Sequence, residues 1–511
     1  MVPPGRYSIA IASANGFSFV ENISAGEDPL VTLSPQCHRL RVKISGTLRI
    51  PTTIAISRVS RSVGDTFIAD ADSRGQAVMC LADGSYSAHA EGSITSLAMP
   101  ITMPKDETID LRGYETAVVQ QAPLDLHIEH ADLYSFSRSL LDRRILGLGE
   151  ANHGTGDFFT YRGKLSLELA RSGRLRTILI EADAIEMMIV DDYAMGKDVD
   201  VKKAVSALRF WTTDVHEFLS FLEDARTYNA TASSGAKLHV LGIDAQRLEP
   251  PVRFLLAHRA TCAISEREAA LLARIGPDHG KSFTSFSEED RSSVLAMLDR
   301  LKSVSSPPVG LSEDSTRVSI AARSISHQLG YLREAAGDDD LRDLAMADLA
   351  AYIVDLDNSQ QTALWAHDDH VAREAAGAAK SLGQYLSARY GDAYYPIAFL
   401  SYSGNARAWD AGGEIGVIPH ELGPAPPFNI ESVIINAADT TDVAWVRLDT
   451  ARGALQQWTA TPRFSREFGS SYSPGDTQKL RALPSGVAGV VVIRHATAST
   501  PTPTGVRKVS P

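Results

Sequence analysis

Several features are scarce in this 511-residue chain, and each scarcity excludes a class of protein. Three cysteines are too few for a fold built on disulfide bonds. Lys and Arg number 50 against 62 Asp and Glu, and the formal net charge of −12 argues against nucleic acid as a partner. No run approaches the roughly 18 consecutive apolar residues of a membrane span. With 44% hydrophobic residues, the chain is typical of a globular protein of two or three domains.

The chain also lacks an evident nucleophile. No strand is followed by the Gly-x-Ser-x-Gly turn that presents a catalytic serine in many hydrolases. Cys262 lies in a predicted helical region without a histidine motif around it, so we expect a free thiol with no catalytic role. Cys37 and Cys80 fall in predicted strands of one module and could pair in an oxidising compartment. Any hydrolysis by this chain would therefore use water as the nucleophile.

The segment 145–181 is typical of a strand–helix–strand unit. A first apolar run ends at Glu150 and His153, a stretch with apolar residues at helical spacing follows, and a second apolar run ends at Glu181. In such units ligands bind beyond the carboxyl ends of the strands, so we expect these three side chains to lie together. Arg162, two turns into the helix, can reach the same place.

Two further apolar runs end in the same way. One stops at Asp244, and the other stops at His367 with His370 three residues behind it. Polar residues commonly mark the end of any strand, which is the simpler interpretation of each one alone. Four runs that bring only Glu, Asp and His to one edge favour a site, because an ordinary exposed edge would also carry Lys, Ser, Asn and Thr.

At these positions the sequence resembles the erythromycin esterase-like hydrolases. Gly-Glu-Ala-Asn-His-Gly-Thr at 149–155 is similar to the family's Gly-Glu-Ala-Thr-His-Gly-Thr, and Arg162 and Glu181 match its downstream arginine and strand-end glutamate. Trp-Ala-His-Asp-Asp-His at 365–370 resembles its Trp-Ala-His-Asn-x-His. The resemblance runs from about 124 to 497. The strand–helix–strand pattern predicts an α/β fold with a mostly parallel sheet, and the mostly helical pattern of about 191–350 predicts an inserted helical cap over the carboxyl edge of that sheet.

Three residues depart from the family's pattern. Asn152 and Asp157 replace the commoner Thr and Glu, and Asp368 replaces Asn between the two histidines. We expect the extra negative charge of Asp368 to raise the basicity of the neighbouring histidines.

The residues present predict a hydrolase that cleaves an ester or lactone, of a macrocycle or other natural product. His153 is the best general base, because an imidazole titrates near neutral pH, and Glu150 or Glu181 would stabilise its charged form. Arg162 and either His367 or His370 would bind the developing oxyanion. The resemblance implies that no metal or other cofactor takes part. The residues that we expect to bind a small-molecule or peptide ester substrate are Trp211, His216, Glu217 and Asp244.

Other functions use the same residues. His153, His367 and His370, with Glu150 or Glu181, could instead ligate a divalent metal, although the charge of Arg162 would repel it. The same site could serve an acyl transferase or cyclase. A glycan- or peptide-binding protein on an inactive hydrolase fold is a further alternative, which the retention of six polar groups disfavours.

The start of the chain resembles a different kind of module. Alternating segments near 5–33 and 83–111 form an imperfect repeat, similar to the transthyretin-like or carboxypeptidase regulatory-like β-sandwiches of secreted enzymes; a chance likeness between hairpins is the alternative. We therefore expect a longer natural chain, secreted or periplasmic, although the chain as written begins without a signal peptide and would stay in the cytoplasm. The predicted organisation is a partial β module (1–35), a β-sandwich (36–111), a linker (112–123), the catalytic domain (124–497) and a disordered tail (498–511).

Overall fold

The computed structural model describes most of the chain. The residues described are 5–13, 16–25, 38–46, 53–58, 66–81, 83–90, 94–95, 99–114, 116–121, 128, 131–277, 279–303, 314–333, 339–356, 360–374, 380–410, 416–438, 442–473 and 477–502.

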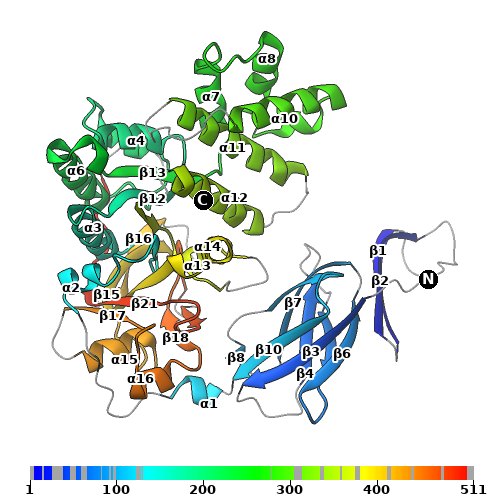
Figure 1. The fold of residues 1–511 in the computed structure, drawn as a ribbon. Coiled ribbons are helices and arrows are strands. Elements are labelled where there is room, and N and C mark those ends of the chain that lie inside the picture. The colour runs from blue at the N-terminus through cyan, green and yellow to red at the C-terminus, as the bar shows by residue number, and fades with distance from the viewer. Residues whose placement is uncertain are drawn as a thin grey trace.

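A nine-stranded, mostly parallel sheet forms the centre of the larger part of the molecule (Figure 1). Its main path runs in the order β13 (His239–Asp244), β12 (Leu175–Asp183), β14 (Gln361–Trp365), β11 (Ile145–Leu148), β15 (Tyr394–Asp410), β21 (Gly489–Ala496) and β17 (Val443–Arg447). The first six strands are parallel, whereas β17 runs antiparallel to β21. The short strands β16 (Val417–Leu422) and β19 (Ser471–Tyr472) pair with β15. The predicted α/β fold with a mostly parallel sheet is confirmed.

Helices cover both faces of this sheet, which explains why its inner strands are apolar almost throughout. Every residue of β11, β13 and β14 is buried. One face packs against α3 (Gly156–Arg171) and α6 (His216–Thr231), which contribute Leu165 and Phe218 to that core. The other face packs against α11 (Asp314–Arg333) and α12 (Asp339–Leu356), which contribute Ile325 and Ile353.

The helical region predicted as a cap at 191–350 is therefore not a separate layer above the sheet edge. Its α6 and α12 belong to the two layers that flank the sheet, because each buries apolar side chains in the core on one face of the sheet. Only α7 (Glu249–Ala257), α8 (Glu266–Ile275) and α10 (Glu288–Lys302) extend outward from α11 as a stacked group (Figure 1). No helix among the described residues is long and apolar enough to cross a bilayer.

The order of the strands places a crevice at their carboxyl ends. The chain moves from β11 outward through β12 to β13, then returns to insert β14 between β11 and β12, and continues on the other side of β11 with β15. The connections thus leave β11 in opposite directions, and ligands of open α/β sheets bind at such a switch point. Residues at or just after the carboxyl ends of β11, β12, β13 and β14 line a cavity there.

Two four-stranded sheets precede this part of the chain and share one apolar core. One sheet has the order β6 (Gln76–Leu81), β3 (His38–Gly46), β10 (Thr108–Tyr114) and β8 (Ile94–Thr95). The other has the order β5 (Thr66–Asp70), β4 (Thr53–Arg58), β7 (Gly84–Ala90) and β9 (Met99–Met103). A separate hairpin, β1 (Gly5–Ser13) and β2 (Gly16–Ala25), occupies the range predicted as a partial module. Cys80 is disulfide-bonded and Cys262 is a free, buried thiol; Cys37 lies outside the described residues.

Two predicted boundaries need correction. The linker predicted at 112–123 begins with the last residues of β10 and continues into α1 (Thr116–Val119), where Arg463 donates hydrogen bonds to the carbonyl oxygens of Val118, Val119 and Gln121. The tail predicted as disordered from 498 is instead tied down through Thr502, because Ser499 donates its N–H to the carbonyl of Gly154 and Thr502 donates to Asp214. Residues 503–511 lie outside the described residues.

Candidate active site

The turn after β11 positions the carboxylate of Glu150 and the imidazole of His153. The side chain of Asn152 accepts hydrogen bonds from the N–H of Gly154, at 3.1 Å, and from the hydroxyl of Thr155, at 2.9 Å, which closes the turn. A side chain at Gly154 would lie 1.7 Å from the carbonyl oxygen of Arg407, so only glycine fits there. Asn152 thus replaces the family's Thr without loss of the turn.

Glu150 connects a histidine to an arginine. One carboxylate oxygen accepts a hydrogen bond from Nδ1 of His153 at 2.8 Å, and the other accepts from Nη2 of Arg162 at 2.6 Å. Burial opposes a charged carboxylate, but the Arg162 guanidinium and the bond to His153 hold the pKa of Glu150 below its ordinary value. Glu150 is therefore ionised at neutral pH and fixes the proton of His153 on Nδ1, which leaves Nε2 as the basic atom.

His367 lies beside His153, with the planes of the two rings tilted by 51°. The two ring centroids are 5.1 Å apart. Nδ1 of His367 accepts a hydrogen bond from the N–H of Asp369, at 3.2 Å, so the proton of the neutral ring sits on Nε2. Burial lowers the pKa of His367 to about 4, which keeps this ring neutral. Its buried Nε2 has no hydrogen-bond partner among the described residues.

Both Nε2 atoms face the same space beside Gly469. A methyl group at Gly469 would lie 3.9 Å from Nε2 of His153 and 4.0 Å from Nε2 of His367. By the hydrogen bonds described above, Nε2 of His153 presents a lone pair and Nε2 of His367 presents a proton.

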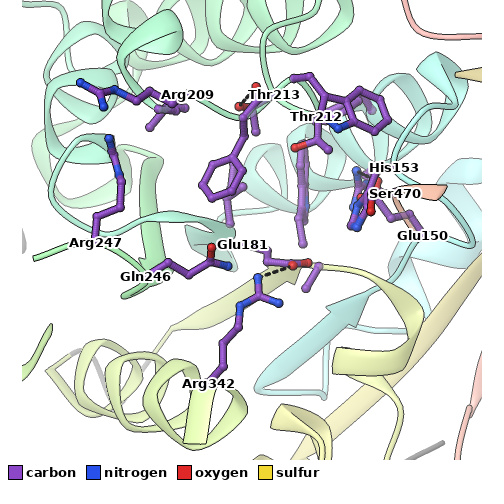
Figure 2. Close-up of a pocket in the computed structure, with 18 of the residues that line it drawn as sticks. Glu150, His153, Glu181, Arg209, Thr212, Thr213, Gln246, Arg247, Arg342 and Ser470 are labelled. Carbon is purple, nitrogen blue, oxygen red and sulfur yellow. Dashed lines mark hydrogen bonds and ion pairs between the residues drawn. The ribbon is translucent and has the colours of Figure 1, made fainter. Parts of the chain in front are cut away.

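Glu181 holds the second half of the site. One oxygen accepts from the backbone N–H of His367 at 2.9 Å, and the other accepts from Arg342 at 2.7 Å (Figure 2). His370 lies 3.4 Å from the same oxygen through Nε2 and donates from Nδ1 to Asp343 at 2.7 Å. Burial disfavours a charged ring, but Glu181 and Asp343 outweigh it and raise the pKa of His370 to about 10. Nε2 of His370 also lies 3.1 Å from Nη1 of Arg342, so His370 and Arg342 both pack against the same side of Glu181.

Asp368 does not act on the histidines as the sequence predicts. Its carboxyl group is buried against Gly149, and neither oxygen has a hydrogen-bond partner among the described residues. Burial, with a contribution from Glu467, raises its pKa well above the ordinary value. A neutral carboxyl has the shape of the family's Asn and adds no charge. The basicity of His367 is accordingly lowered, not raised, and that of His370 is raised by other carboxylates.

A cavity of about 640 Å³ opens above these strand ends (Figure 2). Its lining includes Glu150, His153, Arg162, Glu181 and Trp211 from the predicted set, so the structure brings these five together. His367 and His370 lie directly behind them through the contacts described above. The residues that line the cavity without having been predicted include Leu208, Arg209, Phe210, Gln246, Arg247, His279, Arg342 and Ser470.

Three residues predicted to bind substrate do not line this cavity. His216 and Glu217 border a separate small hollow between α3 and α6, because they begin α6 on its outer side, and Glu217 accepts hydrogen bonds from the N–H of Thr500. Asp244 is buried and accepts from Arg342 at 2.8 Å and from Gln246 at 2.9 Å. It positions two residues of the cavity wall.

The alternative set of metal ligands is not arranged as a metal site. Among the described residues, no group of three or more His, Cys, Asp or Glu side chains is placed to hold a metal ion. His153 and His370 direct a nitrogen to a carboxylate within the protein, and both oxygens of Glu181 are occupied by donors. The charge of Arg342 on Glu181 opposes a cation in the same place.

The cavity residues that the sequence analysis did not predict differ in whether the sequence carries a signal for them. Gln246 and Arg247 follow the strand that ends at Asp244. The expectation that ligands bind beyond the carboxyl ends of strands would have included them if it had been applied to the three residues after that strand. Arg342, followed by Met346 and Ala347, is a weak point of resemblance to the family, and this was the signal that could have included it among the site residues. Gly469 and Ser470 come from a loop before β19 and carry no sequence signal.

Comparison with known proteins agrees with this fold. The profile of the erythromycin esterase family matches residues 174–493, which is more than half of the chain but begins after Glu150 and His153. A Bacillus cereus protein shares 18% identity, over 76% of this chain and 97% of that one, with a TM-score of 0.58. A succinoglycan biosynthesis protein shares 16%, over 75% and 97%, with a TM-score of 0.60. A mutant of the erythromycin esterase EreC in its open conformation shares 19%, over 74% and 96%, with a TM-score of 0.51.

Proposed function

This chain belongs to the erythromycin esterase family, and we propose that it hydrolyses an ester or lactone with a water molecule activated by His153. The observation that carries the proposal is the pair of Nε2 atoms, on His153 and His367, that face one space beside Gly469. A water molecule there meets a base and a hydrogen-bond donor, while the cavity beside it accommodates the substrate.

In the proposed reaction one proton moves from water to His153 and then from His153 to the leaving group. Nε2 of His153 takes a proton from water as the oxygen attacks the carbonyl carbon, and the Glu150 carboxylate stabilises the resulting imidazolium through Nδ1. The N–H of His367 Nε2 donates to the oxyanion of the tetrahedral intermediate. When the intermediate collapses, the carbon–oxygen bond of the ester breaks and His153 returns its proton to the leaving alkoxide. The products are a carboxylic acid and an alcohol.

The charged residues around this pair act by positioning. Arg162 holds Glu150 at 2.6 Å, and Glu181 holds the backbone of His367 at 2.9 Å. None of these steps uses a metal. We also propose that the β strands before residue 115 form modules without a catalytic group, because the described lining of the cavity comes from residues 150–470 alone.

The test is the variant His153→Asn, assayed on a chromogenic ester with His216→Asn as the matched control. His216 is exposed at the hollow between α3 and α6, so its loss should leave turnover unchanged. Loss of the general base should lower kcat about 10²–10⁴-fold with little change in substrate affinity, because the base acts only in the transition state. Activity that disappears on dialysis against EDTA and returns with zinc or manganese would contradict the metal-free mechanism. Full activity of His153→Asn would contradict the proposal as a whole.

A further inference from the structure

Two arginines lie at the end of the cavity that is remote from His153. Figure 2 shows Arg209 and Arg247 on one side of the pocket, with His153, Glu150 and Ser470 on the other. Arg247 donates a hydrogen bond to the carbonyl of Ala207 at 3.4 Å, which places it against the segment that carries Arg209. Both residues line the cavity.

Arg209 and Arg247 have fewer carboxylate partners than the other two arginines that line the cavity. Arg162 is paired with Glu150, and Arg342 is paired with Glu181 and Asp244. The side chain of Arg209, in contrast, is exposed and makes no hydrogen bond or ion pair with any described residue, although its backbone N–H donates to the carbonyl of Ser206.

Arg247 is balanced only in part. Its one carboxylate contact is from Nε to Asp183 at 3.3 Å, and its Nη2 donates to a backbone carbonyl. Among the described residues, the two arginine side chains at this end thus share a single carboxylate partner.

The backbone is strained at two residues that line the cavity. Three non-glycine residues among those described have a positive φ, and two of them, Arg209 at 61° and His279 at 54°, line the cavity. Residues other than glycine rarely adopt this conformation, and those that do concentrate at binding and catalytic sites. Arg209 is thus held over the cavity by a conformation that its sequence does not favour.

The strand order fixes how far apart the two ends lie. Arg247 follows β13 and His153 follows β11, with β12 and β14 between them. Three strand spacings correspond to roughly 14 Å. The cavity wall also includes the aromatic side chains of Phe159, Phe210 and Trp365. The cavity thus has a reactive end and a cationic end.

We propose that Arg209 and Arg247 bind an anionic group of the substrate, a carboxylate or a phosphate, so that the protein acts on esters with a negative charge remote from the scissile bond. Arginine binds both oxyanions through two parallel N–H donors. This inference rests on the proposed function for its scissile bond, while binding of the anion itself can be measured without turnover.

The experiment compares matched substrates on the full-length chain. Mono-4-nitrophenyl esters of dicarboxylic acids of increasing length are assayed beside the same esters with the remote carboxylate capped as a methyl ester. The variants are Arg209→Gln, Arg247→Gln and Arg209→Lys, with Arg267→Gln as the control, since Arg267 pairs with Glu289 and Asp290 on the surface. The measured quantity is the ratio of kcat/KM for the anionic ester to that for the neutral ester.

We expect this ratio to exceed one at an optimal chain length for the wild type, to fall at least tenfold in Arg209→Gln and Arg247→Gln, and to recover in part in Arg209→Lys. Arg267→Gln should keep the wild-type ratio. Turnover without an anionic preference at any length would overturn the anion site and leave the hydrolase intact. Calorimetry with adipate and with inorganic phosphate tells whether the site binds a carboxylate or a phosphate. Binding that is abolished in Arg209→Gln supports the anion site even if no ester is hydrolysed. In that case the proposed hydrolysis is wrong and the anion site stands.

Discussion

His153 and His367 lie with their rings 5.1 Å apart and their Nε2 atoms turned to a common space, but their partners assign them opposite roles. A carboxylate accepts the Nδ1 proton of His153, whereas a backbone N–H donates to Nδ1 of His367. The first ring therefore presents a lone pair and the second presents a proton. Neighbours in the sequence, Glu150 and Asp369, thus decide which histidine is the base and which is the donor.

Replacement of His367 should show whether its contribution to turnover is the hydrogen bond that its neutral ring donates. Because this ring is neutral above a pKa of about 4, its contribution is the N–H of Nε2. His367→Ala should lower kcat about 10²–10³-fold, the usual cost of one oxyanion donor, whereas His367→Gln, which places an amide N–H near the same point, should retain more activity. Steady-state kinetics from pH 5 to 9 check this. Equal loss in the two variants at every pH would assign His367 a purely structural role.

A methyl group at Gly469 should block the space between the histidines. Gly469→Ala introduces contacts of 3.9 and 4.0 Å, which are ordinary for packed atoms, so the fold should be kept. The water that we place there would be displaced, and kcat should fall about 10–100-fold, since small misplacements near the reacting atoms cost this much. Gly235→Ala, which meets no atom within 4 Å, is the control. Wild-type turnover in Gly469→Ala would move the attacking water elsewhere.

The strand-end residues could be predicted because parallel strands place their carboxyl ends at one edge and an apolar run shows where each strand stops. This principle identified Glu150, His153 and Glu181 and the fold that contains them. It could not identify Gly469, because a loop from a distant part of the chain reaches the site only through tertiary packing. Nor could it assign the charge of Asp368, because the state of a carboxyl depends on its burial, which no local pattern records.

Asp368→Asn should stabilise the protein at neutral pH. The native carboxyl keeps its proton above the pKa of about 4 of an unfolded aspartate, so the wild type loses stability as the pH rises from there. The Asn variant has no such proton, and its advantage in free energy of unfolding should grow by up to about 1.4 kcal/mol per pH unit above pH 4 and vanish below it. Urea unfolding at several pH values measures this, with the exposed Asp299→Asn as control. A constant difference across pH would show that Asp368 is ionised.

The last prediction concerns where the catalytic part of the chain begins. The buried guanidinium of Arg463 donates to the carbonyl oxygens of Trp458, Val118, Val119 and Gln121, and burial lowers its pKa to about 10. A chain that starts at Thr116 keeps all four acceptors, whereas one that starts at Leu124 keeps only that of Trp458. Because an unsatisfied buried charge costs about 2 kcal/mol or more, the shorter chain should be less stable by at least that amount.

Turnover of both chains should match that of the full-length protein at a temperature where both are folded, since the described cavity lining begins at Glu150. Differential scanning calorimetry and an ester assay measure the two properties separately. The variant Arg463→Leu in the shorter chain provides a control, because removal of the charge should recover part of the lost stability. If the chain from Leu124 is as stable as the chain from Thr116, the helix α1 is a linker after all, and the hydrogen bonds of Arg463 to it contribute nothing to folding.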